Sequence, residues 1–158
     1  MPRFARWLAL AGAVVVADFA TKAWVLAAFR PHETLPVTSF FNLVLVFNPG
    51  ASFSFLADAG GWQRWFFVAL ALAISAWLAI TIRRHANERL LPAALALVLG
   101  GALGNVIDRL RFGAVVDFLD VHAFGWHWPA FNVADSAITV GVILLIWQQL
   151  FHEGKPHD

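Results

Sequence analysis

The feature that most constrains the fold is a set of four long apolar runs, each bounded by charged or turn-forming residues. The runs cover residues 4–29, 62–82, 90–110 and 133–151. The hydrocarbon core of a bilayer is about 30 Å thick, and a helix needs about 20 mostly apolar residues to cross it. The composition agrees, because 60% of the 158 residues are hydrophobic and only 13% are charged. The sequence therefore predicts an all-α membrane protein of four transmembrane helices, forming one domain over residues 1–158.

Charges at the ends of the runs predict the orientation. An even number of spans puts both termini on one side of the membrane, and Lys and Arg are enriched near cytoplasmic span ends. Arg3, Arg6, Arg83, Arg84, Arg89 and Lys155 lie on the side of the termini, whereas Arg30, Arg64, Arg109 and Arg111 lie on the other. We expect both termini in the cytoplasm.

The first run follows Arg3 and Arg6 as a signal peptide would, but its length and its internal charges indicate a retained helix.

Two segments are too polar or too rich in Pro and Gly to span the membrane. In the first, residues 40–47 and 51–55 are rich in strand formers, and Asn-Pro-Gly at 48–50 is a turn signal. We expect a small extracytoplasmic β-rich element between the first two spans, with aromatic residues touching lipid or substrate. The second, residues 111–130, is predicted to be interfacial, with Asp120 as a loop carboxylate. Its histidines, His122 and His127, are expected at the interface rather than as metal ligands.

Composition also excludes several kinds of function. A net charge of +1 leaves no basic face for a nucleic acid. The chain has no Cys, which excludes a thiol nucleophile, disulfides and thiolate metal sites. Neither the HExxH motif of zinc peptidases nor the G-x-S-x-G motif of serine hydrolases occurs. We expect no metal and no cofactor.

Polar side chains within the runs gather at one level of the membrane. Buried charged groups cost several kcal/mol unless they are paired or functional. Because the spans alternate in direction, all of these groups fall toward the outer leaflet, and the connection between the last two spans begins and ends there. The residues are Asp18, Lys22, Asn105, Asp108, Arg109, Asn132 and Asp135 in the runs, with Asp117 in the connection. Two carboxylates that share a proton, such as Asp117 and Asp135, suffice for peptide hydrolysis.

Structural explanations of the same residues remain open at this point. Asp18 and Lys22 are four residues apart and could simply neutralise each other. Asn132 could be an N-cap, with Asp135 as a first-turn carboxylate favoured by the helix dipole. Arg109 could extend to the interface. The small residues at 100–104 are expected to let helices pack closely.

Two other functions would also use such residues. A proton-coupled transporter would hold its charges near the membrane midplane rather than at one face. A structural assembly factor would tolerate Asp117→Asn, whereas a peptidase would not.

Five blocks of the sequence resemble the lipoprotein signal peptidase (signal peptidase II) family. They are residues 18–22, resembling D-x-x-T-K; 48–53, resembling N-x-G-A-x-F; 101–109, resembling G-x-x-G-N-x-x-D-R; 115–118, matching V-V-D-F; and 131–135, matching F-N-x-A-D. Each block alone is a weak signal. Their order, in a chain with four spans, makes a chance resemblance improbable.

The resemblance implies a specific reaction. It implies an aspartic endopeptidase of the cell inner membrane that cuts diacylglyceryl-modified prolipoproteins N-terminal to the lipidated Cys, at the periplasmic face. It assigns the catalytic pair to Asp117 and Asp135. Supporting roles are implied around the substrate for Asn48, Gly50, Asn105, Asp108, Arg109, Asn132 and Ala134, and in holding the site together for Asp18 and Lys22. A monomer that contacts membrane lipid is expected, and inhibition by globomycin-type compounds is implied.

Overall fold

The computed structural model describes residues 3–50 and 60–152. Its helices are α1 (Arg3–Ala28), α2 (Gln63–Arg84), α3 (Leu90–Phe112) and α4 (Val133–His152). Its strands are β1 (Thr34–Pro36), β2 (Phe41–Asn48), β3 (Val115–Ala123) and β4 (Trp126–His127). Within the described residues, these four helices are long and apolar enough to cross a membrane. The predicted spans are confirmed, and each boundary lies within two residues of its expected position.

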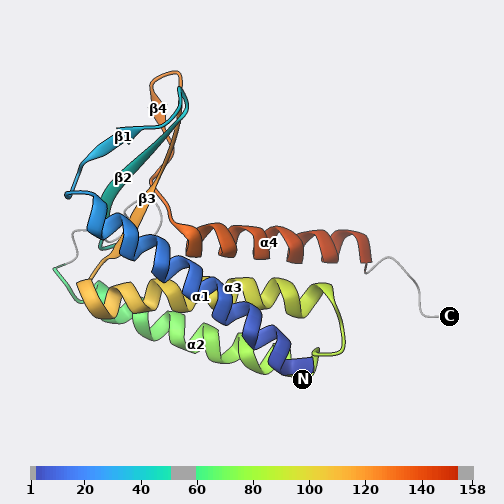
Figure 1. Ribbon diagram of the computed structural model, residues 1–158. Coiled ribbons are helices and arrows are strands. Elements are labelled where there is room, and N and C mark those ends of the chain that lie inside the picture. The colour runs from blue at the N-terminus through green and yellow to red at the C-terminus, as the bar shows by residue number, and fades with distance from the viewer. Residues whose placement is uncertain (1–2, 51–59, 153–158) are drawn as a thin grey trace.

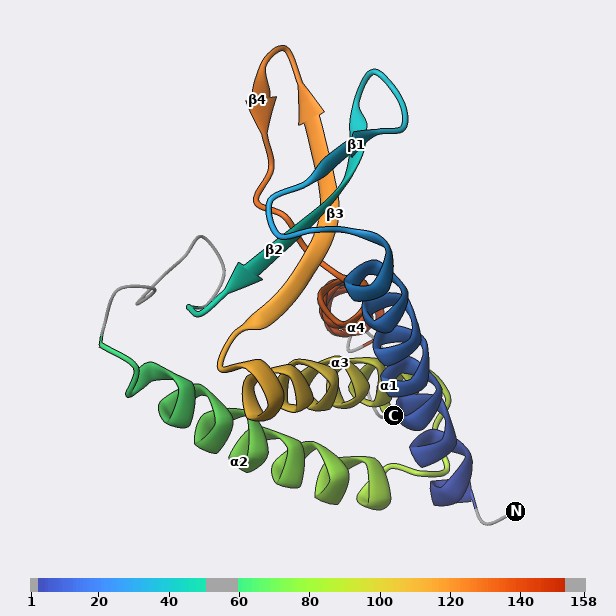
Figure 2. The same cartoon turned by 60° about the vertical axis from the view of Figure 1, so that its left-hand side comes forward.

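The helices and the sheet occupy different parts of the molecule. The sheet projects from one end of the helix bundle, as Figures 1 and 2 show. The start of α1, the α2–α3 link and the end of α4 lie at the opposite end (Figure 1). This arrangement agrees with the prediction that both termini share one side of the membrane.

Helix α3 is the centre of the bundle, because it packs against each of the other three helices. Glycines on α3 permit this close packing. A Cβ atom at Gly100 would lie 2.6 Å from the carbonyl oxygen of Ala11 on α1, and one at Gly101 would collide with the carbonyl oxygen of Ala134 on α4. Such contacts require a side chain no larger than hydrogen. The prediction that residues 100–104 serve helix packing is confirmed.

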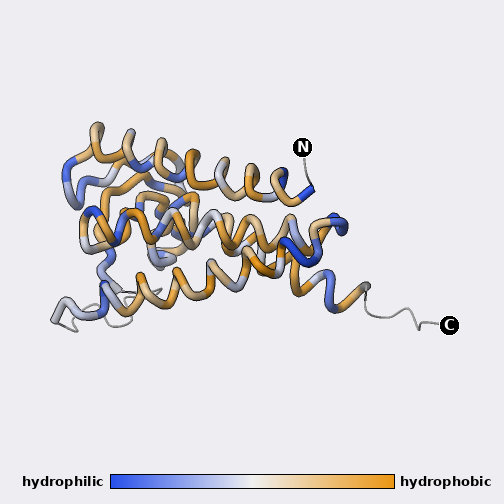
Figure 3. Tube along the Cα trace, turned by 90° about the horizontal axis from the view of Figure 1, so that it is seen from below, coloured by the Kyte–Doolittle hydropathy of each residue, from blue (hydrophilic) through white to orange (hydrophobic). Residues whose placement is uncertain are grey.

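The outer faces of the helices are apolar. Figure 3 shows hydrophobic residues dominating the helices, with hydrophilic segments mainly near their ends. Large side chains such as Trp77, Ile80 and Ile143 are more than half exposed. A soluble protein would bury such residues, whereas in a bilayer they face lipid while the helix satisfies its own backbone hydrogen bonds.

The sheet is antiparallel, with strand order β1-β2-β3-β4. The predicted strand at 40–47 is confirmed as β2, but its described partners are β1 and β3; the predicted partner at 51–55 lies outside the described residues. The β2–β3 pairing runs from Phe41 opposite Val121 to Asn48 opposite Val115, with an irregularity between Leu43 and Val46. Leu45, Val116 and Phe118 pack on Val25 of α1, which fixes the sheet to the bundle.

Residues 111–130 contain no further helix long enough to span a membrane, as predicted, and their expected interfacial position stays a prediction. They contain β3 and β4, joined by a turn in which Phe124 and Gly125 have φ angles of 52° and 78°. Two successive positive φ angles suit a tight hairpin. The prediction that Asp120 is a loop carboxylate was wrong: it lies on β3 and is only 7% exposed, because strand pairing that no local pattern indicates buries it.

Candidate active site

Two chain reversals bring Asp117 and Asp135 to the same region. Helix α3 ends at Phe112, and its C-cap Gly113, with a φ of 77°, turns the chain toward β3, which carries Asp117. After the β3–β4 hairpin the chain returns, and α4 begins at Val133, which places Asp135 in the first turn of that helix. Both carboxylates therefore lie where the helix bundle meets the sheet.

Asn132 links the two carboxylate-bearing elements. Its Oδ1 accepts a hydrogen bond from the backbone N–H of Asp135 at 2.9 Å, which confirms the predicted N-cap of α4. Its Nδ2 donates to Oδ1 of Asp117 at 2.7 Å and to the carbonyl oxygen of Val116 at 3.2 Å. One fully buried amide thus joins the start of α4 to β3.

Asn105 plays a comparable part for the second carboxylate. Its Nδ2 donates to Oδ1 of Asp135 at 2.8 Å. Its own Oδ1 accepts hydrogen bonds from Lys22 at 3.2 Å and from Asn132 at 3.3 Å. These bonds orient the amide so that its NH₂ group points to Asp135.

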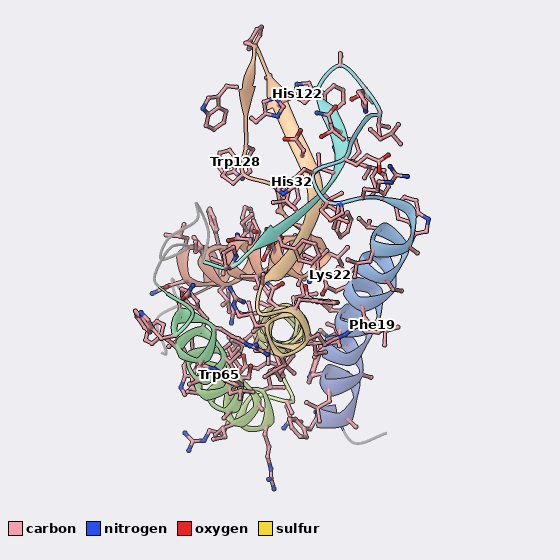
Figure 4. The ribbon with its side chains drawn as sticks, turned by 90° about the vertical axis from the view of Figure 1, so that its left-hand side faces the viewer. Phe19, Lys22, His32, Trp65, His122 and Trp128 are labelled. Atoms are coloured by element: carbon pink, nitrogen blue, oxygen red, sulfur yellow. The ribbon has the colours of Figure 1, made fainter. Side chains whose placement is uncertain are left out.

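Lys22 is the centre of a buried charge network. Its Nζ lies 2.7 Å from Oδ2 of Asp18 and 2.7 Å from Oδ2 of Asp108, and all three residues are at most 3% exposed. The simple explanation, in which Asp18 and Lys22 only neutralise each other, omits the second carboxylate. Figure 4 labels Lys22 on α1, from which it reaches α3.

The two carboxylates paired with Lys22 also bind backbone beside the candidate dyad. Oδ1 of Asp18 accepts from the N–H of Ala134, the residue before Asp135, at 2.9 Å. Oδ2 of Asp108 accepts from the N–H of Val116, the residue before Asp117, at 3.0 Å. The network therefore fixes the main chain immediately before each candidate catalytic residue.

A cavity of about 870 Å³ opens beside these groups. Asp117, Asp135, Asn105 and Arg109 contribute polar groups to its lining. The other lining residues are Val46, Phe47, Asn48, Pro49, Gly50, Val115, Trp128, Pro129, Ala130, Phe131, Ser136, Ile138, Thr139 and Val140. A mainly apolar pocket with a few convergent polar groups is typical of a ligand or substrate site.

Arg109 and Asn48 tie the turn after β2 to the site. Nη2 of Arg109 donates to the carbonyl oxygen of Gly50 at 2.9 Å, so this side chain binds protein rather than extending away to the interface. Oδ1 of Asn48 accepts from the N–H of Gly50 at 3.1 Å, and Asn48 also hydrogen-bonds the carboxyl group of Asp117. Residues 48–50 thus form one edge of the cavity.

The electrostatics of Asp117 fit a group that carries a proton near neutral pH. Burial raises the pKa of Asp117 to about 7, and the nearby charge of Asp135 adds to the increase. Hydrogen bonds from Asn132 and Asn48 oppose it. A carboxyl group with such a pKa is suited to general acid–base catalysis.

Comparison with known proteins supplies an independent identification. The family model for signal peptidase II matches residues 10–151 of this chain. The chain belongs to the signal peptidase II family. Members of this family are peptidases that act on lipoprotein precursors, and the lipoprotein signal peptidase of Azoarcus sp. strain BH72 is 61% identical over 91% of this chain and 82% of its own. That of Janthinobacterium sp. strain Marseille is 52% identical over 94% of this chain and 90% of its own.

Solved structures place the signal peptidase II chain among bacterial membrane enzymes. One such enzyme superposes with a TM-score of 0.84 at 32% identity, covering 98% of this chain and 94% of the other. A second has a TM-score of 0.81 at 33% identity, covering 93% and 94%. The predicted family, the four-span fold and the multi-pass membrane character of the protein are therefore confirmed.

The structure brings the predicted site residues of this signal peptidase together. Asp117, Asp135, Asn48, Gly50, Asn105 and Arg109 line the cavity, while Asp18, Lys22, Asp108, Asn132 and Ala134 lie in the hydrogen-bond network behind it. Sequence reasoning missed the cavity wall at 128–131 and the lining residues Ser136, Ile138 and Thr139 on α4. The wall carries no polar pattern that would have revealed it, but the spacing of Asp135 and Thr139, four residues apart on a helix, could have indicated the α4 face.

Proposed function

We propose that this chain is an aspartic endopeptidase that removes signal peptides from diacylglyceryl-modified prolipoproteins by cutting N-terminal to the lipidated Cys. Asp117 and Asp135 are the catalytic pair. The observation that carries the proposal is their common position on the lining of one cavity, each held by a buried asparagine. Membership in the signal peptidase II family supplies the substrate class.

In the proposed reaction, Asp135 begins ionised and Asp117 begins protonated. Asp135 accepts a proton from water as the water oxygen attacks the scissile carbonyl carbon, and Asp117 donates its proton to the carbonyl oxygen. The tetrahedral intermediate then loses the amine of the lipidated Cys. Asp135 gives its proton to that nitrogen, and Asp117 takes its proton back, which restores both groups.

Two observations support this assignment of protons. The pKa of Asp117, raised to about 7 by burial and by Asp135, allows it to hold a proton near neutral pH. Asp135 lies in the first turn of α4, where the helix dipole favours a negative charge.

Other lining groups have proposed roles in binding the peptide. Nε of Arg109 is buried and, within the described part of the chain, has no hydrogen-bond partner, so it can donate to a carbonyl of bound substrate. The edge formed by residues 48–50 covers the peptide. The lipidated Cys would keep the scissile bond near the membrane surface, which is the level of a site at one end of the helices.

We further propose that the termini are cytoplasmic and that the site faces the periplasm. The support is the sequence bias of Lys and Arg toward the termini and the position of the sheet at the opposite end of the bundle (Figure 1). This orientation puts the site on the side to which lipoprotein precursors are exported.

The decisive experiment is cleavage of a purified diacylglyceryl-modified prolipoprotein in detergent by wild type, Asp117→Asn and Asp135→Asn. Each variant is expected to reduce kcat by about 10³-fold or more while keeping the wild-type helical content, because each removes a group that moves protons in both steps. Mass spectrometry of the product should place the new N-terminus at the lipidated Cys.

Glu88→Gln is the matched control, because it makes the same chemical change at an exposed position at the other end of the bundle. It should cut at the wild-type rate. Near-normal cleavage by either dyad variant would refute the two-carboxylate mechanism, and absence of cleavage by wild type would refute the proposed substrate.

A further inference from the structure

A second cluster of titratable side chains lies on the sheet, away from the catalytic pair. The carboxylate of Asp120 on β3 accepts hydrogen bonds from Nδ1 of His127 at 2.8 and 3.0 Å and from Nδ2 of Asn42 at 2.7 Å. His127 belongs to β4 and Asn42 to β2, so one buried carboxylate joins three strands. The reaction proposed above does not use this cluster.

The chain that follows His127 forms a wall of the active-site cavity. Residues 128–131 all line the cavity. The N–H of Trp128 donates to the carbonyl oxygen of Val121 at 2.8 Å, and the N–H of Phe131 donates to that of Leu119 at 3.0 Å. The wall therefore lies along β3, and the bond from His127 to Asp120 is a side-chain restraint at its start.

In Figure 4, His122 lies on the part of the sheet far from the helices, and Trp128 lies nearer to them. Asp120 is three residues beyond Asp117 on the same strand. A restraint at Asp120 is thus transmitted to the cavity along β3 and through the short segment from His127 to Trp128. We propose that Asp120 and His127 are positioning residues that hold the 128–131 wall against the peptide substrate; this inference rests on the proposed function.

The two histidines of the hairpin differ in their surroundings. The rings of His122 and His127 are stacked with centroids 4.8 Å apart. Nε2 of His122 is buried and, among the described residues, has no hydrogen-bond partner. His127 instead has a side chain 54% exposed and a carboxylate against Nδ1. His127 is therefore the ring that binds Asp120.

The groups that face His127 are few. Asp120 and His122 are on β3, β2 contributes only the neutral Asn42, and β1 and β2 contain no ionisable residue. Although burial opposes ionisation of Asp120, hydrogen bonds from His127 and Asn42 outweigh it and lower the pKa of this carboxyl group. Asp120 is therefore an ionised acceptor, and a hydrogen bond to an ionised acceptor is stronger than one between neutral groups.

The test compares His127→Ala with His127→Asn by steady-state cleavage of the diacylglyceryl-modified prolipoprotein. Asparagine carries an N–H donor at the same number of bonds from the backbone as Nδ1, whereas alanine carries none. We expect His127→Ala to raise KM about fivefold or more with kcat within about twofold of wild type, and His127→Asn to bring KM most of the way back to the wild-type value.

Phe124→Asn is the control at the same hairpin, because Phe124 is fully exposed and asparagine tolerates a positive φ angle. It should leave KM unchanged. A wild-type KM in His127→Ala, or a loss confined to kcat, would overturn the positioning role.

A second readout does not depend on cleavage. Hydrogen exchange at the amides of Trp128 and Phe131, followed by mass spectrometry, should be faster in His127→Ala than in wild type. If wild type fails to cut but this difference is found, the proposed function fails while the restraint on the wall stands. Equal exchange in the two proteins would refute the restraint itself.

Discussion

The side-chain amide nitrogen of Asn132 lies 2.7 Å from Oδ1 of Asp117, while its oxygen caps the helix that begins just before Asp135. One residue thus combines a structural task with a positioning task. The two tasks use different atoms of the same amide, so substitutions can separate them.

Asn132→Ser should separate the cap from the bond to Asp117. Serine is a good N-cap but its hydroxyl is too short to replace the amide that reaches β3, so the cap should be kept while the bonds of the amide nitrogen are lost and kcat falls. Asn132→Ala loses the cap as well, and should be about 1 kcal/mol less stable than Asn132→Ser. Apparent melting temperatures in detergent and kcat on the lipidated precursor measure the two effects. Equal kcat in wild type and Asn132→Ser would show that the bond to Asp117 has no catalytic role.

Asp117 should make the protein less stable as the pH rises. Burial raises its pKa in the folded protein from 3.8 to about 7, so between these values the folded protein retains a proton that the unfolded chain releases. The associated stability is complete below about pH 4 and is lost as the pH rises through about 7. Asp117→Asn has no charge to bury and should melt at a higher temperature than wild type at pH 8, with a smaller difference at pH 5. Glu88→Gln, at an exposed carboxyl, should show no such trend.

The network around Lys22 predicts an unusual pattern of rescue. Lys22→Met leaves two buried carboxylates, Asp18 and Asp108, without their cation and should cost about 3–5 kcal/mol. Adding Asp18→Asn and Asp108→Asn removes the uncompensated charges, so the triple variant should melt well above the single variant. Differential scanning fluorimetry in detergent measures the melting temperatures of the two variants. A triple variant no more stable than Lys22→Met would show that the charges are not what the network balances.

The sequence predicted those features that depend on composition or local order. The four spans follow from apolar length alone, and the grouping of Asp18, Asn105 and Asp135 at one level follows from alternating helix direction. The N-cap at Asn132 is likewise a local pattern, three residues before Asp135.

Features made by long-range pairing were not predictable in the same way. The contact of Asn42 with Asp120 joins residues far apart in sequence and depends on the register of β2 against β3. No periodicity in 111–130 indicated that register, so Asp120 was expected in a loop. The same reason explains why the cavity wall at 128–131 emerged only from the structure.

The packing of α3 against α4 gives the last prediction, at Gly104. A Cβ atom there would lie 2.7 Å from Oδ2 of Asp18 and 3.3 Å from Cβ of Ala134. The carboxylate of Asp18 cannot move away from such a methyl group, because it is hydrogen-bonded by both Lys22 and the N–H of Ala134. Gly104→Ala should therefore cost about 1–3 kcal/mol and reduce kcat, since relief requires the start of α4, and with it Asp135, to move.

Gly12→Ala is the matched control for this change. Gly12 is also a glycine within a described helix, but a Cβ atom there meets nothing within 4 Å. Alanine has the higher helix propensity, so this variant should be as stable as wild type or more so by up to about 1 kcal/mol. If both glycine variants melt at the wild-type temperature, the α1–α3–α4 contact at Gly104 adapts to a methyl group, and the position of Asp135 is set by the Asn132 cap and Asn105 rather than by helix packing.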